Sequence, residues 1–249
     1  MKDRIYANYF MKNRYKEYEE FLKAFLNAGY QFICIRDYEK LKDQKCKHII
    51  LRHDIDSDVK IAKKMFEIEK QLNIKSTYYF RLCTFDVKFI NEIYEYGSEV
   101  GYHYEEIAQY CKDKRDFSKD FVDNNMEEIK KCMINNITNF EEKAGMKIDS
   151  IASHGDFINR KINVRNEYLY DTDMKKRLNL IEAYDVESMI NFRTIDAMYP
   201  KCWQHNYKEA INSNSQKVLI LVHPRWWNKA PITRTKLEIQ RIVEAIKYK

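Results

Sequence analysis

The chain has 249 residues, a length at which one large α/β domain or two small ones can bury a core. Hydrophobic residues make up 45% and charged residues 33% of the sequence, and only 5 Gly and 3 Pro occur, which excludes long flexible linkers and low-complexity tails. The net charge of +6 is spread over helix-like stretches in which Lys and Glu alternate, and this argues against a nucleic-acid-binding surface.

Three features of the sequence predict a soluble cytoplasmic protein. The 6 cysteines form no CxxC pair and no disulfide-framework spacing, so we expect reduced thiols. The first 20 residues contain no apolar stretch of the kind found in secretory signals. No segment approaches the roughly 20 consecutive apolar residues that a membrane-spanning helix needs.

The first half of the chain alternates between helix-like and strand-like segments. A helix is predicted where apolar residues recur at helical spacing, and a strand where β-branched and aromatic residues form a short run. Gly29 and Gly97 mark the ends of two helices. In chain order the predicted segments are a helix at 15–30, strands at 31–35 and 48–56, a helix at 58–74, a strand at 75–82, a helix at 86–97 and a strand at 99–105.

The second half continues the alternation and predicts the fold class. The run "VLILV" (218–222) is typical of a strand buried on both faces, and repeated strand–helix alternation favours a parallel sheet. About seven strands without a Gly-rich phosphate loop favour an α/β barrel over a Rossmann fold, in a single domain spanning 1–249. The predicted segments are a helix at roughly 118–144, strands at 149–155, 180–186, 193–199 and 217–224, and a helix at 235–248.

Ionisable side chains occur where four of the predicted strands end. In parallel barrels the carboxyl ends of the strands converge on one mouth, where active sites are built. Because side chains alternate along a strand, the two acidic residues of the first strand share a face, as do the His and Glu of the second. We therefore predict a shared metal site, although a single strand-end His is more often structural. The side chains at these ends are Asp54 and Asp56, His103 and Glu105, His154, and His223.

The other histidines are predicted to lie outside the metal site. His53 points to the opposite face of its strand from Asp54, so we expect it to be packed or to support a ligand from behind. His48 and His205 are interpreted as surface or structural residues.

Four motifs resemble those of the polysaccharide deacetylases, the NodB-like carbohydrate esterases. They stand as "RHDID" (52–56), "GSEVGYHYEE" (97–106), "SHG" (153–155) and "HPRWW" (223–227). The chain looks most like a divergent branch with the motifs RHDxD, HYE, SHG and HPxWW, and the match spans roughly 48–228 in the family's order. The resemblance implies a distorted (β/α) barrel and a metal-dependent hydrolase that removes an acetyl group from an N-acetylated sugar.

The resemblance also implies roles by position. Asp54 matches the general base of the family, and Asp56 matches its metal-binding Asp. His103 matches the first metal-binding His of the second motif, and His223 matches the general acid.

Two departures from the family pattern concern the third metal ligand. The second motif usually carries another His four residues on, where this chain has Ile107, and the third motif usually contains an Arg and a Pro-Tyr, where this chain has "SHGDF". We predict that His154 supplies the missing ligand from the next strand. Glu105 is the competing candidate.

The predicted ligands are suited to a divalent ion that assists amide hydrolysis. One carboxylate and two imidazoles leave positions open for water and for the substrate carbonyl. Zn²⁺ suits this set best, although two imidazoles and one carboxylate also suit Fe²⁺. Asp54 is then placed to take a proton from water, and His223 to protonate the departing nitrogen.

Aromatic and basic residues beside His223 are predicted to bind the substrate. Trp226 and Trp227 offer ring faces on which a sugar can stack, with plugging of the barrel rim as the alternative. Arg225 and Arg52 are expected either to orient the carboxylates or to bind an acidic group of the substrate.

The expected substrate is an N-acetylated sugar of a cell-envelope polysaccharide or of its nucleotide- or lipid-linked precursor. Two other functions remain open: a catalytically inactive carbohydrate-binding protein of the same fold, and a metal hydrolase acting on a non-glycan amide or ester. The residue at 107 favours the first alternative, and the Trp pair favours a sugar over the second. Nucleic acid is not an expected partner.

Overall fold

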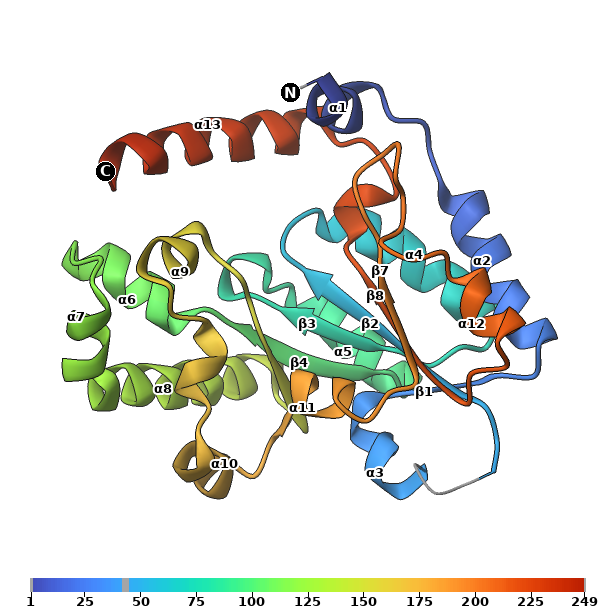
Figure 1. The fold of residues 1–249 in the computed structure, drawn as a ribbon, viewed down its shortest axis with the longest axis horizontal. Helices are drawn as coiled ribbons and strands as arrows, with labels where there is room; N and C mark the ends of the chain where they lie inside the picture. The colour runs from blue at the N-terminus through green and yellow to red at the C-terminus, as the bar shows by residue number, and fades with distance from the viewer. Residues whose placement is uncertain (1, 42–44, 249) are drawn as a thin grey trace.

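The computed structural model describes residues 2–41 and 45–248, which form one parallel sheet with helices packed around it (Figure 1). Along the sheet the strand order is β6-β5-β4-β3-β2-β8-β7, and β1 pairs with β2. Every pairing between these strands is parallel, as predicted, with eight strands instead of about seven. The strands are β1 (Gln31–Ile33), β2 (His48–Ile55), β3 (Thr77–Phe80), β4 (Glu99–Tyr104), β5 (Ser150–Ser153), β6 (Ile181–Glu182), β7 (Phe192–Ile195) and β8 (Lys217–Val222).

Helices connect successive strands, and most of the longer ones cover the outside of the sheet (Figure 1). The longer ones are α2 (Tyr15–Asn27), α4 (Val59–Gln71), α5 (Val87–Tyr96), α6 (Glu106–Lys114), α8 (Met126–Ala144) and α13 (Pro231–Lys247). The shorter ones are α1 (Lys2–Ile5), α3 (Tyr38–Leu41), α7 (Lys119–Asn124), α9 (Phe157–Ile162), α10 (Thr172–Leu178), α11 (Ala183–Glu187) and α12 (Lys208–Asn212). Helical turns η1 (Tyr6–Phe10), η2 (Ile35–Asp37), η3 (Leu82–Thr84), η4 (Asn166–Leu169) and η5 (Pro224–Trp226) complete the chain.

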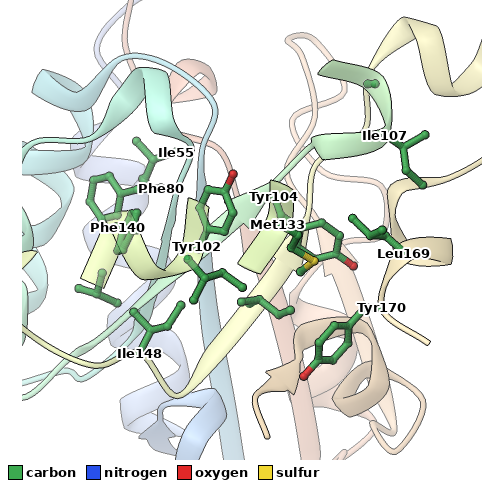
Figure 2. Close-up of a cluster of buried hydrophobic side chains, with 14 of the residues drawn as sticks. Ile55, Phe80, Tyr102, Tyr104, Ile107, Met133, Phe140, Ile148, Leu169 and Tyr170 are labelled. Atoms are coloured by element: carbon green, nitrogen blue, oxygen red, sulfur yellow. The ribbon is translucent and has the colours of Figure 1, made fainter. Parts of the chain in front are cut away.

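Alternating side chains divide each strand between an outer and an inner face. On the outer face of β3 and β4, Phe80, Tyr102 and Tyr104 join the large apolar cluster shown in Figure 2. On the outer face of β2, Ile49 and Leu51 belong to a second cluster, together with residues of α2 and α4. The outer face therefore supplies most of the apolar burial that stabilises the fold.

The sheet is curled into a half-barrel, and its inner face is the narrower of the two. Ile50 of β2 and Ala183, just beyond β6, belong to the same inner apolar cluster. In addition, the Arg52 guanidinium lies 3.0 Å from the Glu187 carboxylate of α11. In a flat sheet β2 and β6 would lie about 19 Å apart, since neighbouring strands are spaced by about 4.8 Å. These contacts therefore require strong curvature.

Gly101 makes close packing possible on the inner face of β4. A Cβ atom at this position would lie 2.4 Å from the Tyr79 ring and 2.5 Å from the Ser150 carbonyl oxygen. No side chain larger than hydrogen fits there, so the glycine sets the position of the strand that carries His103.

Two predicted segments differ from the structure. The strand predicted at 180–186 is mostly helix α11, because the Glu182 side chain accepts the Tyr184 backbone N–H and caps a helical turn. The helix predicted at 118–144 is two helices, α7 and α8, separated at Asn125. The other predicted helices and strands occur with shifted ends.

The last helix, α13, lies beside the N-terminal turns at one end of the molecule (Figure 1). Arg4 forms a salt bridge with Glu238, and Asn8 donates to the same carboxylate. Arg234, almost fully buried, reaches inward to Asp58 at a distance of 2.5 Å. The helix thus turns polar side chains toward the strand ends, and it exposes a row of apolar ones: Ile232, Ile239, Ile242, Val243 and Ile246.

Among the described residues, no helix has both the length and the apolar character needed to cross a bilayer. No disulfide joins the six cysteines.

Candidate active site

The predicted strand-end residues meet at one mouth, and three of them form what we call the cation cluster: Asp56, His103 and His154. The His103 Nε2 atom lies 3.3 Å from Asp56 Oδ1, and His154 Nε2 lies 3.5 Å from the same oxygen. The two imidazole rings are perpendicular, with centroids 5.2 Å apart. Two imidazoles on neighbouring strands therefore converge on one carboxylate oxygen.

The hydrogen bonds of the cation cluster leave its facing atoms without partners. His103 Nδ1 lies 2.9 Å from the Ala152 carbonyl oxygen, which only accepts, so Nδ1 carries a proton and Nε2 is the ring nitrogen turned toward Asp56. Asp56 Oδ1 is buried and has no hydrogen bond of acceptable geometry. Buried polar atoms are normally satisfied, so an oxygen left open between two imidazole nitrogens fits a cation site.

The spacing of these atoms also suits a small cation. Donor atoms about 2.0–2.2 Å from a common tetrahedral ion lie about 3.3–3.5 Å from each other, which agrees with both distances to Asp56 Oδ1. No group of three His, Cys, Asp or Glu side chains within 2–41 and 45–248 is arranged as a complete metal site. The donor atoms and their pairwise distances suit a cation site. That all three residues bind one ion is part of the function proposed below.

Asp54 is held beside the cation cluster by a buried arginine. The Arg52 guanidinium binds it through two parallel contacts, Nε to Oδ1 at 2.8 Å and Nη2 to Oδ2 at 2.9 Å. Burial alone would raise the pKa of Asp54, but the charge of Arg52, with smaller contributions from His103 and His223, brings it below the ordinary value. Asp54 is therefore an oriented carboxylate that stays ionised at neutral pH.

A second group, which we call the acid cluster, consists of His223, Asp196 and Trp227. His223 Nδ1 lies 2.8 Å from Asp196 Oδ1, and Asp196 Oδ2 accepts the His223 backbone N–H at 2.7 Å and the Trp227 indole N–H at 2.9 Å. Burial alone would lower the pKa of His223, but Asp196 outweighs it and raises the pKa to about 9. The imidazole is thus protonated at neutral pH and held with Nε2 free to act.

Glu105, the competing candidate for third ligand, is engaged elsewhere. Arg81 binds its carboxylate from two nitrogens: Nη2 lies 2.6 Å from Oε2, and Nε lies 3.0 Å from Oε1. Burial opposes ionisation of Glu105, but His154 and Arg81 hold its pKa at about 2. Glu105 Oε2 lies 3.3 Å from His154 Nδ1. This geometry places Glu105 behind His154, at the ring nitrogen that faces away from Asp56.

The structure contradicts one of the substrate-binding predictions and leaves the other two as predictions. Trp227 is 1% exposed, and its ring packs against Tyr18 and Trp203, so the prediction that it stacks on a sugar is wrong, and the alternative of a rim plug agrees with its burial. Trp226 is half-buried, with the Arg225 guanidinium 4.6 Å from its ring centroid. Arg225 lines a cavity beside Asp56 and remains a candidate for substrate binding.

His53 lies on the face of its strand that the alternation of side chains predicts, and Ile107 lies outside the site. His53 is fully buried on the outer face of β2, 2.9 Å from Glu69 and stacked on Tyr78. Ile107, at the position where the family has a second His, is completely buried in the apolar cluster of Figure 2. No side chain at position 107 faces the mouth, which explains why His154 is the imidazole opposite Asp56.

The sequence did not predict three residues that hold the side chains of this mouth in place. Asp196, which organises the acid cluster, is not among the site residues predicted from the sequence. Arg81 and Glu187 are also missed, because their partners Glu105 and Arg52 are 24 and 135 residues away in the chain. For Asp196, the available signal is an acidic residue at the carboxyl end of a strand, because β7 ends at Ile195, and Asp54 was identified by the same kind of position near the end of β2.

The comparisons with known proteins give remote similarities of fold only. No protein-family model matches the chain, and no curated protein matches it at a significant level. A CE4 family pseudoenzyme from Bacillus anthracis is 14% identical, with a TM-score of 0.45, and the alignment covers 79% of this chain and 62% of that chain. The chain thus spans less than two thirds of that protein's length.

Two further solved structures show the same degree of similarity. A mutant of that pseudoenzyme with restored enzymatic activity is 13% identical, with a TM-score of 0.45, over 79% of this chain and 64% of that chain. The Xyl-CE4 domain of a multidomain xylanase from the hindgut metagenome of Trinervitermes trinervoides is 12% identical, with a TM-score of 0.42, over 79% and 85%. The residues of this chain itself are therefore the basis of the function proposed below.

Proposed function

We propose that the protein is a metal-dependent hydrolase that removes an acetyl group from an N-acetylated sugar of a cell-envelope polysaccharide or its precursor. The observation that carries this proposal is Asp56 Oδ1, a buried oxygen without a hydrogen bond between His103 Nε2 and His154 Nε2. Next to it lie an ionised carboxylate and a separate protonated imidazole. Amide hydrolysis needs such a proton acceptor and such a proton donor.

Asp56, His103 and His154 would hold the divalent ion, and Zn²⁺ suits this donor set best. When bound, such an ion acts as a Lewis acid and lowers the pKa of water. Three protein ligands would leave further positions on such an ion open to water and substrate.

Asp54 serves as the proton acceptor for the attacking water. The two contacts from Arg52 fix the plane of its carboxylate, and each oxygen keeps a second lone pair. Its lowered pKa keeps it ionised but makes it a weak base. A weak base is sufficient only where the water is acidified, which is why the proposal requires the ion.

His223 serves as the proton donor to the departing nitrogen. The pKa of about 9 keeps the imidazolium form populated at neutral pH. Asp196 holds Nδ1, which leaves Nε2 as the donating atom. Opposite pKa shifts at Asp54 and His223 give one acceptor and one donor, the pattern expected of an acid–base pair.

An acetylated sugar is proposed as the substrate because of the motif resemblance, together with the residues at the mouth. The sugar is proposed to be carried by a polysaccharide or by its nucleotide- or lipid-linked precursor. Trp226, half-buried at the mouth, is the remaining aromatic candidate for stacking on a ring.

Acetate release from a panel of N-acetylated sugars and their phosphate-linked forms tests the proposal. We expect release that requires added Zn²⁺ or another divalent ion and that falls at least about 100-fold in Asp54→Asn. His205→Ala, which changes an exposed histidine outside the mouth, serves as the control and should retain activity. No acetate from any sugar after metal loading would contradict the proposal.

One observation favours a second function, an inactive carbohydrate-binding protein. No complete three-ligand group is present among the described residues, and the family's second His is replaced by buried Ile107. Sugar binding without metal uptake or acetate release would favour this alternative.

A further inference from the structure

A cavity of about 580 Å³ lies between the cation cluster and the inner face of α13. Asp56, Glu105 and His154 line it on one side, and Leu237, Gln240 and Glu244 of α13 line it on the other. Its volume falls within the range of sites that bind small molecules. The proposed scissile bond would therefore lie at the edge of a chamber with room for the rest of a sugar derivative.

Most of the charged side chains that line this cavity are held in ion pairs with one another. A cation held by a fixed carboxylate has little attraction left for a ligand, so paired groups shape the wall without recognising charge. The ion pairs are Arg81–Glu105, Lys112–Asp156, Arg4–Glu238, Arg241–Glu238 and, with the buried Arg234 reaching the wall, Arg234–Asp58.

Arg225 is the exception in this wall. Among the described residues no carboxylate forms an ion pair with it, and its buried Nε has no hydrogen-bond partner. Its guanidinium lies over the Trp226 ring, which orients it without neutralising its charge. Arg234 donates to the Arg225 carbonyl oxygen, so a second guanidinium lies close by.

A cation left unpaired beside a polar cavity selects for a ligand that carries the missing charge. The planar guanidinium offers parallel N–H donors that match two oxygens of a phosphate or carboxylate. A neutral sugar offers hydroxyl and carbonyl oxygens that accept hydrogen bonds but carry no charge to balance the guanidinium. Arg225 is separated from the proposed proton donor His223 by one residue, and it lines the same cavity as Asp56.

We propose that the substrate is an acidic N-acetylated sugar, with a phosphate or carboxylate that Arg225 binds in this cavity. This inference rests on the deacetylase function proposed above and narrows its substrate class. A phosphate would come from a nucleotide- or lipid-linked precursor, and a carboxylate from an acidic sugar of the polysaccharide. Both present the same oxyanion to Arg225.

Calorimetric binding to the Asp54→Asn variant, which is chosen to stop turnover, tests the inference directly. The probes are N-acetylglucosamine, N-acetylglucosamine 1-phosphate and N-acetylmuramic acid, which are neutral, phosphate-bearing and carboxylate-bearing. We expect at least one anionic probe to bind about 10- to 100-fold more tightly than the neutral sugar, as a charge-assisted contact implies. The anionic probe that binds more tightly identifies whether the oxyanion is a phosphate or a carboxylate.

Arg225→Gln in the same background should abolish this preference, and Arg225→Lys should restore part of it. Arg241→Gln is the matched control, because it removes a cation from the same wall that is already paired with Glu238. The preference should survive that change. Equal binding of neutral and anionic probes, or a preference that persists in Arg225→Gln, would overturn the inference.

Acetate release by the unmodified protein separates this inference from the proposed function. Release from neutral and anionic sugars at equal kcat/KM would keep the function and reject the role of Arg225. Tight binding of an anionic probe without acetate release would keep Arg225 as a binding residue and reject the enzyme. Neither binding nor release would reject both.

Discussion

The acid cluster and the cation cluster lie at the same mouth, but the protein satisfies them to different degrees. In the acid cluster, Asp196 accepts three donors from the chain itself. In the cation cluster, Asp56 Oδ1 is buried between two imidazole nitrogens without a hydrogen bond. The first cluster is complete in the protein alone, whereas the second keeps an unsatisfied oxygen. Under the proposed function, this difference assigns the metal-dependent part of the chemistry to the cation cluster.

The largest expected effect comes from removing an imidazole of the cation cluster. His103→Ala should reduce the metal content from about one ion per chain to near zero, and the rate of acetate release by at least about 1,000-fold. Elemental analysis of the purified, metal-loaded variant measures the first quantity. The acid cluster should be intact, so an unchanged metal content in His103→Ala would contradict the assignment.

A smaller effect is expected from the acid cluster, because it acts without the ion. Asp196→Asn should keep the metal content but lower kcat by roughly 100- to 10,000-fold. In the unmodified protein, activity should fall as the pH rises through about 9, where His223 loses its proton. Asp196 is the main cause of the raised pKa, so in the variant this alkaline limb should move toward the ordinary value of about 6.5.

The same pKa shift predicts a dependence of stability on pH. The folded-state pKa of His223 lies above its unfolded value, so its contribution to the free energy of unfolding is complete below about pH 6.5 and is lost as the pH rises through about 9. Denaturant unfolding across this range measures it for the unmodified protein and for Asp196→Asn. A variant with an unchanged pH profile of both activity and stability would separate Asp196 from the titration of His223.

The smallest effect is expected from Trp227, which supports the acid cluster from behind. Trp227→Phe keeps most of the ring but removes the indole N–H that Asp196 Oδ2 accepts, which should lower the free energy of unfolding by about 1–3 kcal/mol. Thermal unfolding measures this loss. Trp226→Phe is the control, because the structure gives the Trp226 ring no such hydrogen bond, and an equal loss in both variants would contradict the assignment.

The sequence predicted the site better where residues follow strands than where they meet across the fold. Alternation along β2 correctly separated Asp54 from His53, and parallel strand ends correctly brought His103, His154 and His223 to one mouth. The pairing of Arg81 with Glu105 depends on the distance between two loops, which no local pattern encodes. The burial of Trp227 was likewise invisible, since it arises from packing against Tyr18, more than 200 residues earlier.

The secondary structure was likewise predicted well in some segments and poorly in others. Periodicity identified α2, α4 and α5, because each has a long apolar face that packs on the sheet. It failed at 180–186, where a single side-chain cap at Glu182 decides between strand and helix. Short elements are decided by one or two contacts, so a pattern averaged over many residues does not resolve them.

The position of β8 has a consequence for how the protein is made. This strand, nearly the last of the chain, inserts between β2 and β7, and β2 is synthesised more than 160 residues earlier. At ordinary synthesis rates one edge of β2 therefore waits for roughly ten to thirty seconds without its permanent neighbour. An open apolar edge of this kind invites pairing with other chains. Ribosome-bound fragments that end before 217 are thus expected to depend on chaperones, whereas the finished chain is not.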